Sequence, residues 1–273
     1  MVSGTARVSS DLAREVSARR WYHTLELPGG IVTPGEYDLR PALRRLPLPA
    51  SLKKMRCLDV GTHDGFWAFE MERRGAEEVV AIDLDDPHRL DWPQPPPQLS
   101  EQTLDDLAGR REAFAIAHRA LGSRVERRSV SVYDLDPAAM GQFDFATIGT
   151  LLLHLRDPAG ALSAIRRVLS GRLLVNDVIS LSLTIARPRT AAAKLLELDD
   201  QPFWWMVNVR GQRRLLRDAG YEILDAGGPY LLDNGAGFQR LSLLRGSQGV
   251  SRARLLLLRR GAPHAWALAR PRV

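Results

Sequence analysis

The chain has 273 residues, 45% of them hydrophobic, and a formal net charge of +6. Its single cysteine, Cys57, excludes a disulfide framework and a cysteine-rich metal site, and it favours a reducing compartment. No apolar run approaches the roughly 20 residues of a membrane span, and the first residues lack the apolar core of a signal peptide. We therefore expect a soluble, cytoplasmic protein that does not enter a membrane.

The positive charge comes mostly from arginines scattered along the chain. In two dense stretches, residues 210–217 and 252–260, the arginines alternate with leucines, as they do on the solvated faces of helices and strands. Basic patches alone are weak indicators of a nucleic-acid groove. The charge pattern therefore favours an ordinary solvated surface.

The N-terminal part of the chain predicts an extension ahead of the main domain. Residues 9–20 have the spacing of a short capped helix, and glycines and prolines indicate a loop over residues 27–40. We expect residues 1–50 to form this extension, with its loop able to fold over an active site as a lid. Residues 51–273 are expected to form the main domain.

The rest of the chain alternates between strand and helix patterns. Expected strands cover residues 56–60, 78–83, 125–135, a run starting at 143, and then 172–178, 221–227 and 264–271. Expected helices cover residues 65–75, 104–122, 157–171 and 212–220, and the proline-rich residues 91–98 form an exposed excursion. This alternation predicts an α/β fold of the Rossmann-like, doubly wound kind, with a mostly parallel, seven-stranded sheet covered on both faces.

The stretch LDVGTHDG, residues 58–65, predicts a ligand site. Asp59 lies near the end of a strand, and Gly61 and Gly65 flank the turn into a helix, where glycine lets the backbone approach a ligand closely. A sheet of this kind binds its ligand at the carboxyl ends of the strands. Asp83 ends the next strand, at the place where an acid accepts both hydroxyls of a bound ribose.

The glycine spacing distinguishes between nucleotide ligands. A dinucleotide fold uses G-x-G-x-x-G and packs a pyrophosphate against the helix N-terminus, whereas this chain has D-x-G-x-x-x-G. The carboxylate of Asp64 lies inside the turn and would repel a pyrophosphate. Asp59 and Asp64 instead suit a ligand with positive charge. S-Adenosylmethionine carries an adenine, a ribose, an ammonium and a sulfonium, and we therefore predict it as the cofactor.

Three segments carry a resemblance to a known family. DVGTHDG resembles motif one of the class I S-adenosylmethionine-dependent methyltransferases, VVAIDL resembles their acidic second strand, and residues 143–177 resemble their fourth strand, the following helix and the fifth strand. This resemblance spans residues 56–226. More narrowly, WYHTLELPGGIVTPGEYDLR resembles the branch of the tRNA wobble-uridine 5-oxyacetate methyltransferase, which transfers a carboxymethyl group from carboxy-S-adenosylmethionine.

The resemblance implies which residues bind the cofactor. They are Asp59, Gly61, Thr62 and Gly65 at its amino-acid end, Asp83 at the ribose, Leu84, Val132 and Tyr133 beside the adenine, and Gly149 and Thr150 along the methionine moiety.

Two departures from the wobble-uridine branch concern the donor. That branch has a tyrosine before the histidine of the fourth-strand loop, whereas this chain has Leu153 before His154, and RRWYHTLEL lacks the lysine of the corresponding segment. Recognition of a carboxylate needs a cation or a hydrogen-bond donor, and leucine supplies neither. We therefore expect plain S-adenosylmethionine as the donor.

Two histidines are candidate catalytic groups, because histidine can take a proton near neutral pH. His23 precedes the expected lid, and His154 follows the fourth strand. A structural role is the favoured alternative for both. The candidate substrate-binding residues come from the N-terminal segment, the glycine turn and an expected substrate-recognition insertion at residues 180–212. They are Trp21, Tyr22, His63, Trp204, Trp205, Asn208 and Arg210.

No spacing of histidines, cysteines and carboxylates suggests a metal site. The favoured function is transfer of a methyl group to an oxygen, nitrogen or carbon atom of a small molecule, such as a secondary metabolite or a sugar-like compound. One alternative is a tRNA wobble-uridine (carboxy)methyltransferase, with tRNA as the partner. A second is a regulator that binds S-adenosylmethionine without catalysis.

Overall fold

The protein is described by a computed structural model that covers residues 2–196, 202–238 and 260–272. Its strands, in chain order, are β1 (Trp21–His23), β2 (Glu26–Leu27), β3 (Ile31–Val32), β4 (Gly35–Asp38), β5 (Arg56–Val60), β6 (Glu78–Asp83), β7 (Glu126–Ser129), β8 (Phe143–Gly149), β9 (Leu169–Val178), β10 (Ala193–Leu195), β11 (Trp205–Val207), β12 (Tyr221–Asn234) and β13 (Ala262–Pro271).

The helices are α1 (Val2–Ser17), α2 (Phe66–Arg73), α3 (Glu101–Leu121), α4 (Pro137–Met140), α5 (Pro158–Arg167), α6 (Leu181–Ala186) and α7 (Val209–Asp218). Short 3-10 turns are η1 (Pro28–Gly30), η2 (Ala42–Arg44), η3 (Pro87–Arg89), η4 (Val132–Asp134) and η5 (Leu152–His154).

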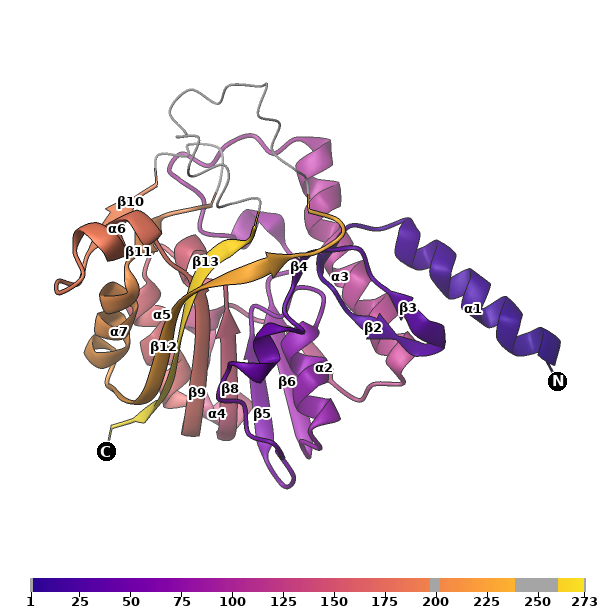
Figure 1. Ribbon diagram of the computed structural model, residues 1–273, viewed down its shortest axis with the longest axis horizontal. Coiled ribbons are helices and arrows are strands. Elements are labelled where there is room, and N and C mark those ends of the chain that lie inside the picture. Colours follow the sequence, from indigo (N-terminus) through magenta and orange to yellow (C-terminus); the bar gives the residue numbers. More distant parts are fainter. Residues whose placement is uncertain (1, 197–201, 239–259, 273) are drawn as a thin grey trace.

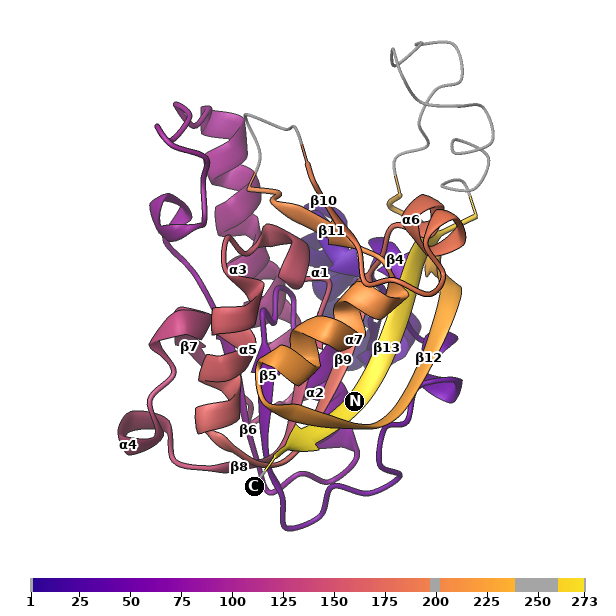
Figure 2. The same ribbon diagram turned by 90° about the vertical axis from the view of Figure 1, so that its left-hand side faces the viewer.

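One large sheet has the strand order β1-β4-β12-β13-β9-β8-β5-β6-β7. Strands β5 to β9 pair in parallel, and β13 runs antiparallel between β9 and β12. Helices lie on both faces of the sheet (Figure 1 and Figure 2). The Rossmann-like, mostly parallel fold predicted from the alternating pattern is therefore confirmed.

The elements of the main domain follow the predicted order, with shifted ends. The helix expected over residues 104–122 begins earlier, because the Ser100 hydroxyl accepts the Thr103 N–H and caps α3. The third strand is shorter than expected, since the Ser131 hydroxyl accepts the Tyr133 N–H and turns the chain into η4. Local side-chain caps therefore set these ends.

Within the described ranges the sheet has nine strands rather than the predicted seven, because the N-terminal segment joins it. Strand β4 pairs in parallel with β1 and antiparallel with the end of β12. Residues 27–40 were expected to be loop, but they contain β3, β4 and part of the β2–β3 hairpin. Strand β3 pairs locally with β2, but the partners of β4 are β1 and β12, so the glycines and prolines of the segment give no sign of the β4 pairing.

The sheet separates two apolar cores. Side chains of a strand alternate between its faces, so Cys57 packs with α2 and α3 in one core while Leu58 and Val60 pack with α5 in the other. All three side chains are buried. Two-sided burial is the reason why the parallel strands are almost continuously apolar.

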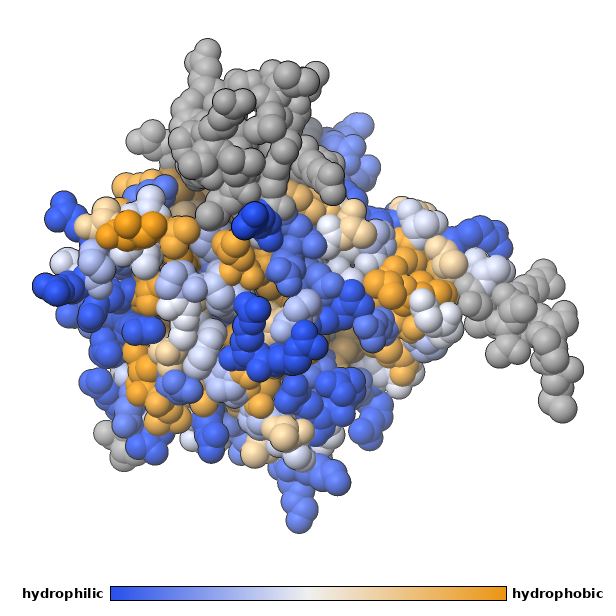
Figure 3. Space-filling view, viewed as in Figure 1, coloured by the Kyte–Doolittle hydropathy of each residue, from blue (hydrophilic) through white to orange (hydrophobic). Residues whose placement is uncertain are grey.

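The surface combines apolar and charged side chains. Hydrophilic residues are spread over the face shown in Figure 3 instead of gathering in one patch. Arginines at the surface pair with carboxylates: the exposed Arg214 with Asp218 and the half-buried Arg128 with Glu126, each at 2.7 Å. The arginine-rich residues 252–259 lie outside the described part of the chain.

Within the described residues, no helix combines the length and the apolar character that crossing a bilayer requires.

Gly35 tests how β1 and β4 are joined. A Cβ at this position would lie 2.2 Å from the backbone of His23, so Gly35→Ala must push the two strands apart. We expect a loss in the free energy of unfolding on the order of 3 kcal/mol, as in an overpacked core. Gly109→Ala is the matched control: nothing lies within 4 Å of its Cβ in α3, and helix propensity predicts a gain of about 0.5–1 kcal/mol. Urea denaturation measures both, and equal behaviour of the two variants would contradict the close approach of β1 and β4.

Candidate functional site

A pocket opens at the carboxyl ends of β5 and β6. The chain proceeds from β5 to β6 and β7 in one direction and places β8 and β9 on the other side, so the strand order reverses beside β5. Ligands of doubly wound sheets bind at this kind of switch point. The lining residues are Val60, Gly61, Ile82, Asp83, Leu84, Arg89, Leu90, Asp91, Val130, Ser131, Val132, Tyr133, Leu151, His154 and Leu155.

The glycine turn between β5 and α2 forms the floor of this site. The Ile82 carbonyl accepts the N–H groups of Gly61 and Thr62, at 2.9 and 3.0 Å. Gly61 has a φ of 75°, and Gly65 has a φ of 96° with Phe69 only 2.3 Å from where its Cβ would be. Both positions therefore require glycine, one for the turn and one for the start of α2.

Asp83 lies in the wall of the pocket. Its carboxylate accepts the N–H groups of His63 and Leu84, each at 2.8 Å. These two bonds fix the orientation of the carboxylate, and each oxygen retains a lone pair for a further donor. The structure thus brings Gly61, Asp83 and Leu84 together as the sequence predicted.

Three buried polar atoms on and beside the turn have no hydrogen-bond partner among the described residues: Asp59 Oδ2, Thr62 Oγ1 and His63 Nδ1. The other oxygen of Asp59 accepts the Thr147 hydroxyl at 2.9 Å. Burial raises the pKa of Asp59 to about 6 and lowers the pKa of His63. Unpartnered buried polar groups are costly, so this cluster suits a ligand that supplies hydrogen bonds and positive charge.

Asp64 serves the chain itself instead of a ligand. Its side chain is fully buried, and it accepts the N–H groups of Tyr22 and His23 at 2.8 Å, as well as His23 Nδ1. Burial opposes its ionisation, but His23 outweighs burial and lowers the pKa of Asp64. The expectation that Asp64 contacts a cationic ligand is therefore wrong, because its carboxylate anchors β1 on the glycine turn.

The three N-terminal candidates have different surroundings. Trp21 is buried, and its Nε1 donates to the Val16 carbonyl at 2.9 Å, so it belongs to the core. Tyr22 lies beside the glycine turn, with its ring centroid 4.8 Å from that of His63 and 5.2 Å from that of Tyr37. Neither Tyr22 nor His23 is among the residues that line the pocket, and Asp64 links the buried His23 to the glycine turn.

Gly149 ends β8 and Thr150 follows it, and neither residue lines the pocket. Thr150 has a φ of 50°, an uncommon backbone conformation for a β-branched residue. Its N–H donates to the Asn176 carbonyl at 3.1 Å, and its hydroxyl is 3.0 Å from His264 Nε2. The surrounding structure therefore holds a strained turn at the end of this strand.

His154 lines the pocket as a neutral imidazole. Its Nδ1 is 3.0 Å from the Pro202 carbonyl, which identifies Nδ1 as the protonated nitrogen. Burial lowers the pKa of His154 to about 4. A base this weak takes protons poorly at neutral pH, so the geometry favours a hydrogen-bonding role over the catalytic role.

The four candidates in the insertion at residues 180–212 are also engaged within the chain. Trp204 Nε1 donates to the Asp91 carbonyl, and Trp205 Nε1 to the Arg156 carbonyl. Asn208 caps α7 and uses its amide on the backbone of residues 187–192. Arg210 is exposed and donates to the Pro188 carbonyl. Residues 197–201 of the insertion lie outside the described residues.

Sequence reasoning missed two acids of the site. Asp91 lies in the proline-rich excursion that was expected to be merely exposed, yet residues 89–91 line the pocket. Trp92 was the available signal, because a tryptophan in such a segment must pack somewhere, and it is buried. Asp177 accepts the N–H groups of Leu151 and Leu152, and so it shapes the loop after β8. The local sequence around Asp177 gives no indication of this role.

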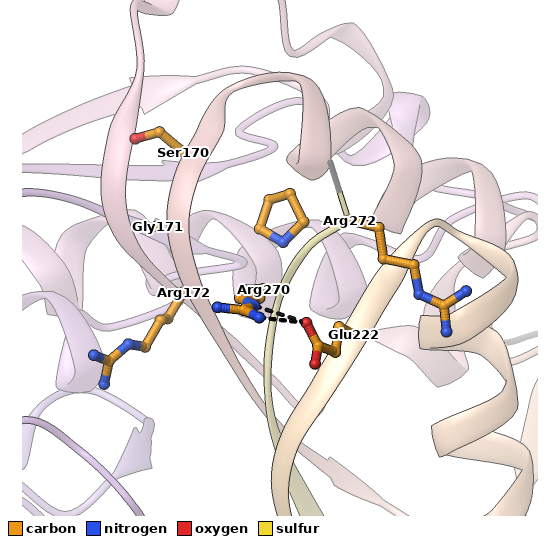
Figure 4. Close-up of a pocket in the computed structure, with 7 residues that line it drawn as sticks. Ser170, Gly171, Arg172, Glu222, Arg270 and Arg272 are labelled. Atoms are coloured by element: carbon orange, nitrogen blue, oxygen red, sulfur yellow. Dashed lines mark hydrogen bonds and ion pairs between the residues drawn. The ribbon is translucent and has the colours of Figure 1, made fainter.

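A wider hollow at the opposite end of the sheet is a poorer candidate. Figure 4 shows Arg172 and Arg272 pointing apart, and Glu222 neutralises Arg270 at 2.7 Å. These side chains do not converge on one ligand. Elsewhere, the described residues contain no group of three or more His, Cys, Asp or Glu side chains placed to hold a metal ion.

Comparison with known proteins places the chain among methyltransferases. A family model described as "Methyltransferase domain" matches residues 35–226. A search of curated proteins gave no match.

Solved structures of low identity share the fold. The 1,6-didemethyltoxoflavin-N1-methyltransferase of Burkholderia thailandensis, with bound 1,6-didemethyltoxoflavin and S-adenosylhomocysteine, is 19% identical over 86% of this chain and 78% of its own, with a TM-score of 0.52. The N-terminal domain of EvdMO1, solved in the presence of SAH and D-fucose, is 17% identical over 98% and 97%, with a TM-score of 0.52. The [4+2]-cyclase SpnF is 18% identical over 100% and 95%, with a TM-score of 0.50.

Asp64→Asn tests the anchor between the glycine turn and β1. An amide cannot accept all three hydrogen bonds and carries no charge for His23, so we expect the free energy of unfolding to fall by about 1–3 kcal/mol. Asp11→Asn is the control, because the Asp11–Arg14 pair is exposed, and such pairs contribute about 0–1 kcal/mol. Urea denaturation at pH 7 measures both variants. Equal, small effects would show that β1 is held by other contacts.

Proposed function

Because the chain belongs to the methyltransferase domain family, we propose that it methylates an oxygen, nitrogen or carbon atom of a small-molecule acceptor. The enzyme takes its methyl group from S-adenosylmethionine. The observation that carries the proposal is the pocket at the switch point, with Asp83 in its wall and three unpartnered polar atoms at its glycine turn.

The residues of the site fit S-adenosylmethionine. Asp83 would accept the ribose hydroxyls, with Leu84 and Val132 beside the adenine. The unpartnered atoms of Asp59 and Thr62 would hold the amino-acid end, since a buried carboxylate matches an ammonium. The turn has the pattern D-x-G-x-x-x-G instead of the dinucleotide pattern G-x-G-x-x-G, which agrees with a phosphate-free ligand.

When bound, the cofactor supplies an electrophilic methyl group on a sulfonium, so the protein chiefly has to bind and orient the two reactants. In the transfer, the sulfur–methyl bond breaks and leaves its electron pair on sulfur, while the acceptor forms a bond to the methyl group. An acceptor O–H or N–H must also lose its proton. Of the two candidate histidines, His23 suits this step better, because Asp64 orients its ring and would stabilise an imidazolium, whereas His154 is a weak base.

Plain S-adenosylmethionine fits better than its carboxy analogue. Leu153, at the position where the wobble-uridine branch has a tyrosine, is buried and apolar. Arg89, the cationic side chain among the pocket-lining residues, lies within 3.2 Å of Asp134 and is on the adenosine wall. Neither group supports recognition of an additional carboxylate.

Two of the structural neighbours support a small acceptor, since one was solved with 1,6-didemethyltoxoflavin and another with D-fucose. A third neighbour is a [4+2]-cyclase, so the fold does not fix the reaction. The tRNA alternative rests on the net charge of +6 and on the N-terminal resemblance. Binding to tRNA would weaken steeply with salt, whereas binding of a neutral small molecule would not.

Calorimetric titration of the purified chain tests the donor. We expect S-adenosylmethionine and S-adenosylhomocysteine to bind with measurable heat. Carboxy-S-adenosylmethionine should bind more weakly, and NAD should not bind. Preferential binding of the carboxy compound would support the wobble-uridine alternative, and binding of NAD alone would refute the proposal.

Asp59 makes the binding pH-dependent. Its folded-state pKa of about 6 lies above the value of about 3.9 in an unfolded chain. The protonated carboxyl therefore stabilises the free protein fully below about pH 4, and this contribution is lost as the pH rises through 6. Conversely, an ammonium binds the ionised form, so we expect the affinity for S-adenosylhomocysteine to fall as the pH drops below 6.

Asp59→Asn separates the two effects. At pH 7.5 it removes a buried charge that costs the free protein about 2–3 kcal/mol, so the melting temperature should rise while the affinity for S-adenosylhomocysteine falls at least tenfold. Differential scanning calorimetry and titration calorimetry measure these quantities. Unchanged affinity across pH 5–8 in the wild type would contradict the role of Asp59.

A further inference from the structure

Asp91 is held in the pocket wall by contacts from three segments. One oxygen of its carboxylate, Oδ2, accepts the Tyr133 hydroxyl at 2.6 Å and the Arg156 N–H at 2.7 Å. Its backbone carbonyl accepts Trp204 Nε1 at 2.7 Å. The other carboxylate oxygen, Oδ1, has no hydrogen-bond partner among the described residues. Because Asp91 lines the pocket, this oxygen is available to a ligand.

Trp204 and Arg156 also hold each other. The Arg156 guanidinium lies over the Trp204 ring, 4.9 Å from its centroid, and donates to the Trp92 carbonyl at 2.7 Å. The backbone N–H of Trp204 donates to the Leu153 carbonyl at 2.7 Å. A cation stacked on tryptophan with both backbones engaged is a rigid arrangement. We name Asp91, Arg156 and Trp204 the clamp.

The clamp lies on one side of the pocket only. Its members contact Tyr133, which lies in η4, and Leu153, which lies in the loop after β8. The unpartnered atoms of Asp59, Thr62 and His63 lie in β5 and in the glycine turn, and among the described residues no hydrogen bond joins them to the clamp. The pocket therefore has two ends that different residues control.

We propose that the clamp is a second cofactor-binding element, in which Asp91 accepts a hydrogen bond from the adenosine half while Trp204 and Arg156 position Asp91. This inference rests on the proposed cofactor. It assigns Trp204 a task in holding the donor, as a positioning residue instead of an acceptor-facing wall.

Titration calorimetry on the full chain with two probes tests the clamp. S-Adenosylhomocysteine has both halves of the cofactor, and 5′-methylthioadenosine lacks the amino-acid end. Trp204→Phe keeps an aromatic ring under Arg156 but removes the N–H that holds Asp91. One hydrogen bond is worth about 0.5–1.5 kcal/mol. We therefore expect both probes to bind about 3- to 10-fold more weakly, with the same factor for each probe. Asp59→Asn should weaken only S-adenosylhomocysteine.

Trp205→Phe is the matched control. It removes the same kind of N–H donor from the neighbouring residue, and that N–H contacts the Arg156 carbonyl at 3.0 Å without touching Asp91. We expect less than a twofold change for either probe. Should Trp204→Phe lower the melting temperature by more than about 5 °C, Arg156→Lys tests the same clamp in its place. It removes the stacked guanidinium, and the same loss for both probes is expected.

Unchanged affinity of a folded clamp variant for both probes would overturn the inference, as would an equal loss in Trp205→Phe. A clamp variant that loses S-adenosylhomocysteine but keeps 5′-methylthioadenosine would also overturn it, because the effect would then lie at the amino-acid end. Failure of the wild-type chain to bind S-adenosylhomocysteine would instead refute the proposed function.

Discussion

The carbonyl of Ile82 and the carboxylate of Asp83 hold the glycine turn that begins α2. Three consecutive N–H groups, from residues 61 to 63, donate to these two acceptors at the end of β6. The turn also positions Asp64, which anchors β1, and it follows directly after β5, which contains Asp59. A change in this turn would therefore disturb the floor of the pocket and the N-terminal strands together.

Burial decides the electrostatics of the site. Several ionisable groups around the turn are removed from water, and burial raises the pKa of Asp59 to about 6 and lowers that of His154 to about 4. Both shifts disfavour the charged form in the free protein. A cationic ligand would favour the ionised form of Asp59, and the neutral His154 would not repel it. The arrangement therefore suits an ammonium and a sulfonium. Groups with perturbed pKa values gathered in one pocket are typical of functional sites.

Segments far apart in sequence enclose the same pocket. Residues 87–92, the loop after β8 and the segment ahead of α7 meet around Asp91 and Arg156. On the opposite side, the N-terminal strands extend the sheet past β12 and bring Tyr22 to the glycine turn. The parallel sheet is common to proteins of different activity, and these added segments distinguish one member from another.

The sequence by itself determined the strand–turn–helix unit, the acid at the end of β6 and hence the cofactor class. These features depend on residues close together in the chain, where glycine spacing and side-chain alternation act locally. Only the tertiary structure decided that Asp64 binds β1, that Asn208 caps a helix, and that Asp91 reaches the pocket. The same holds for β4, whose loop-like residues become a strand because β1 and β12 supply partners. The sequence does not show whether a polar side chain forms its hydrogen bonds with a ligand or with a distant part of the backbone. Burial and pairing in the folded chain determine which of the two occurs.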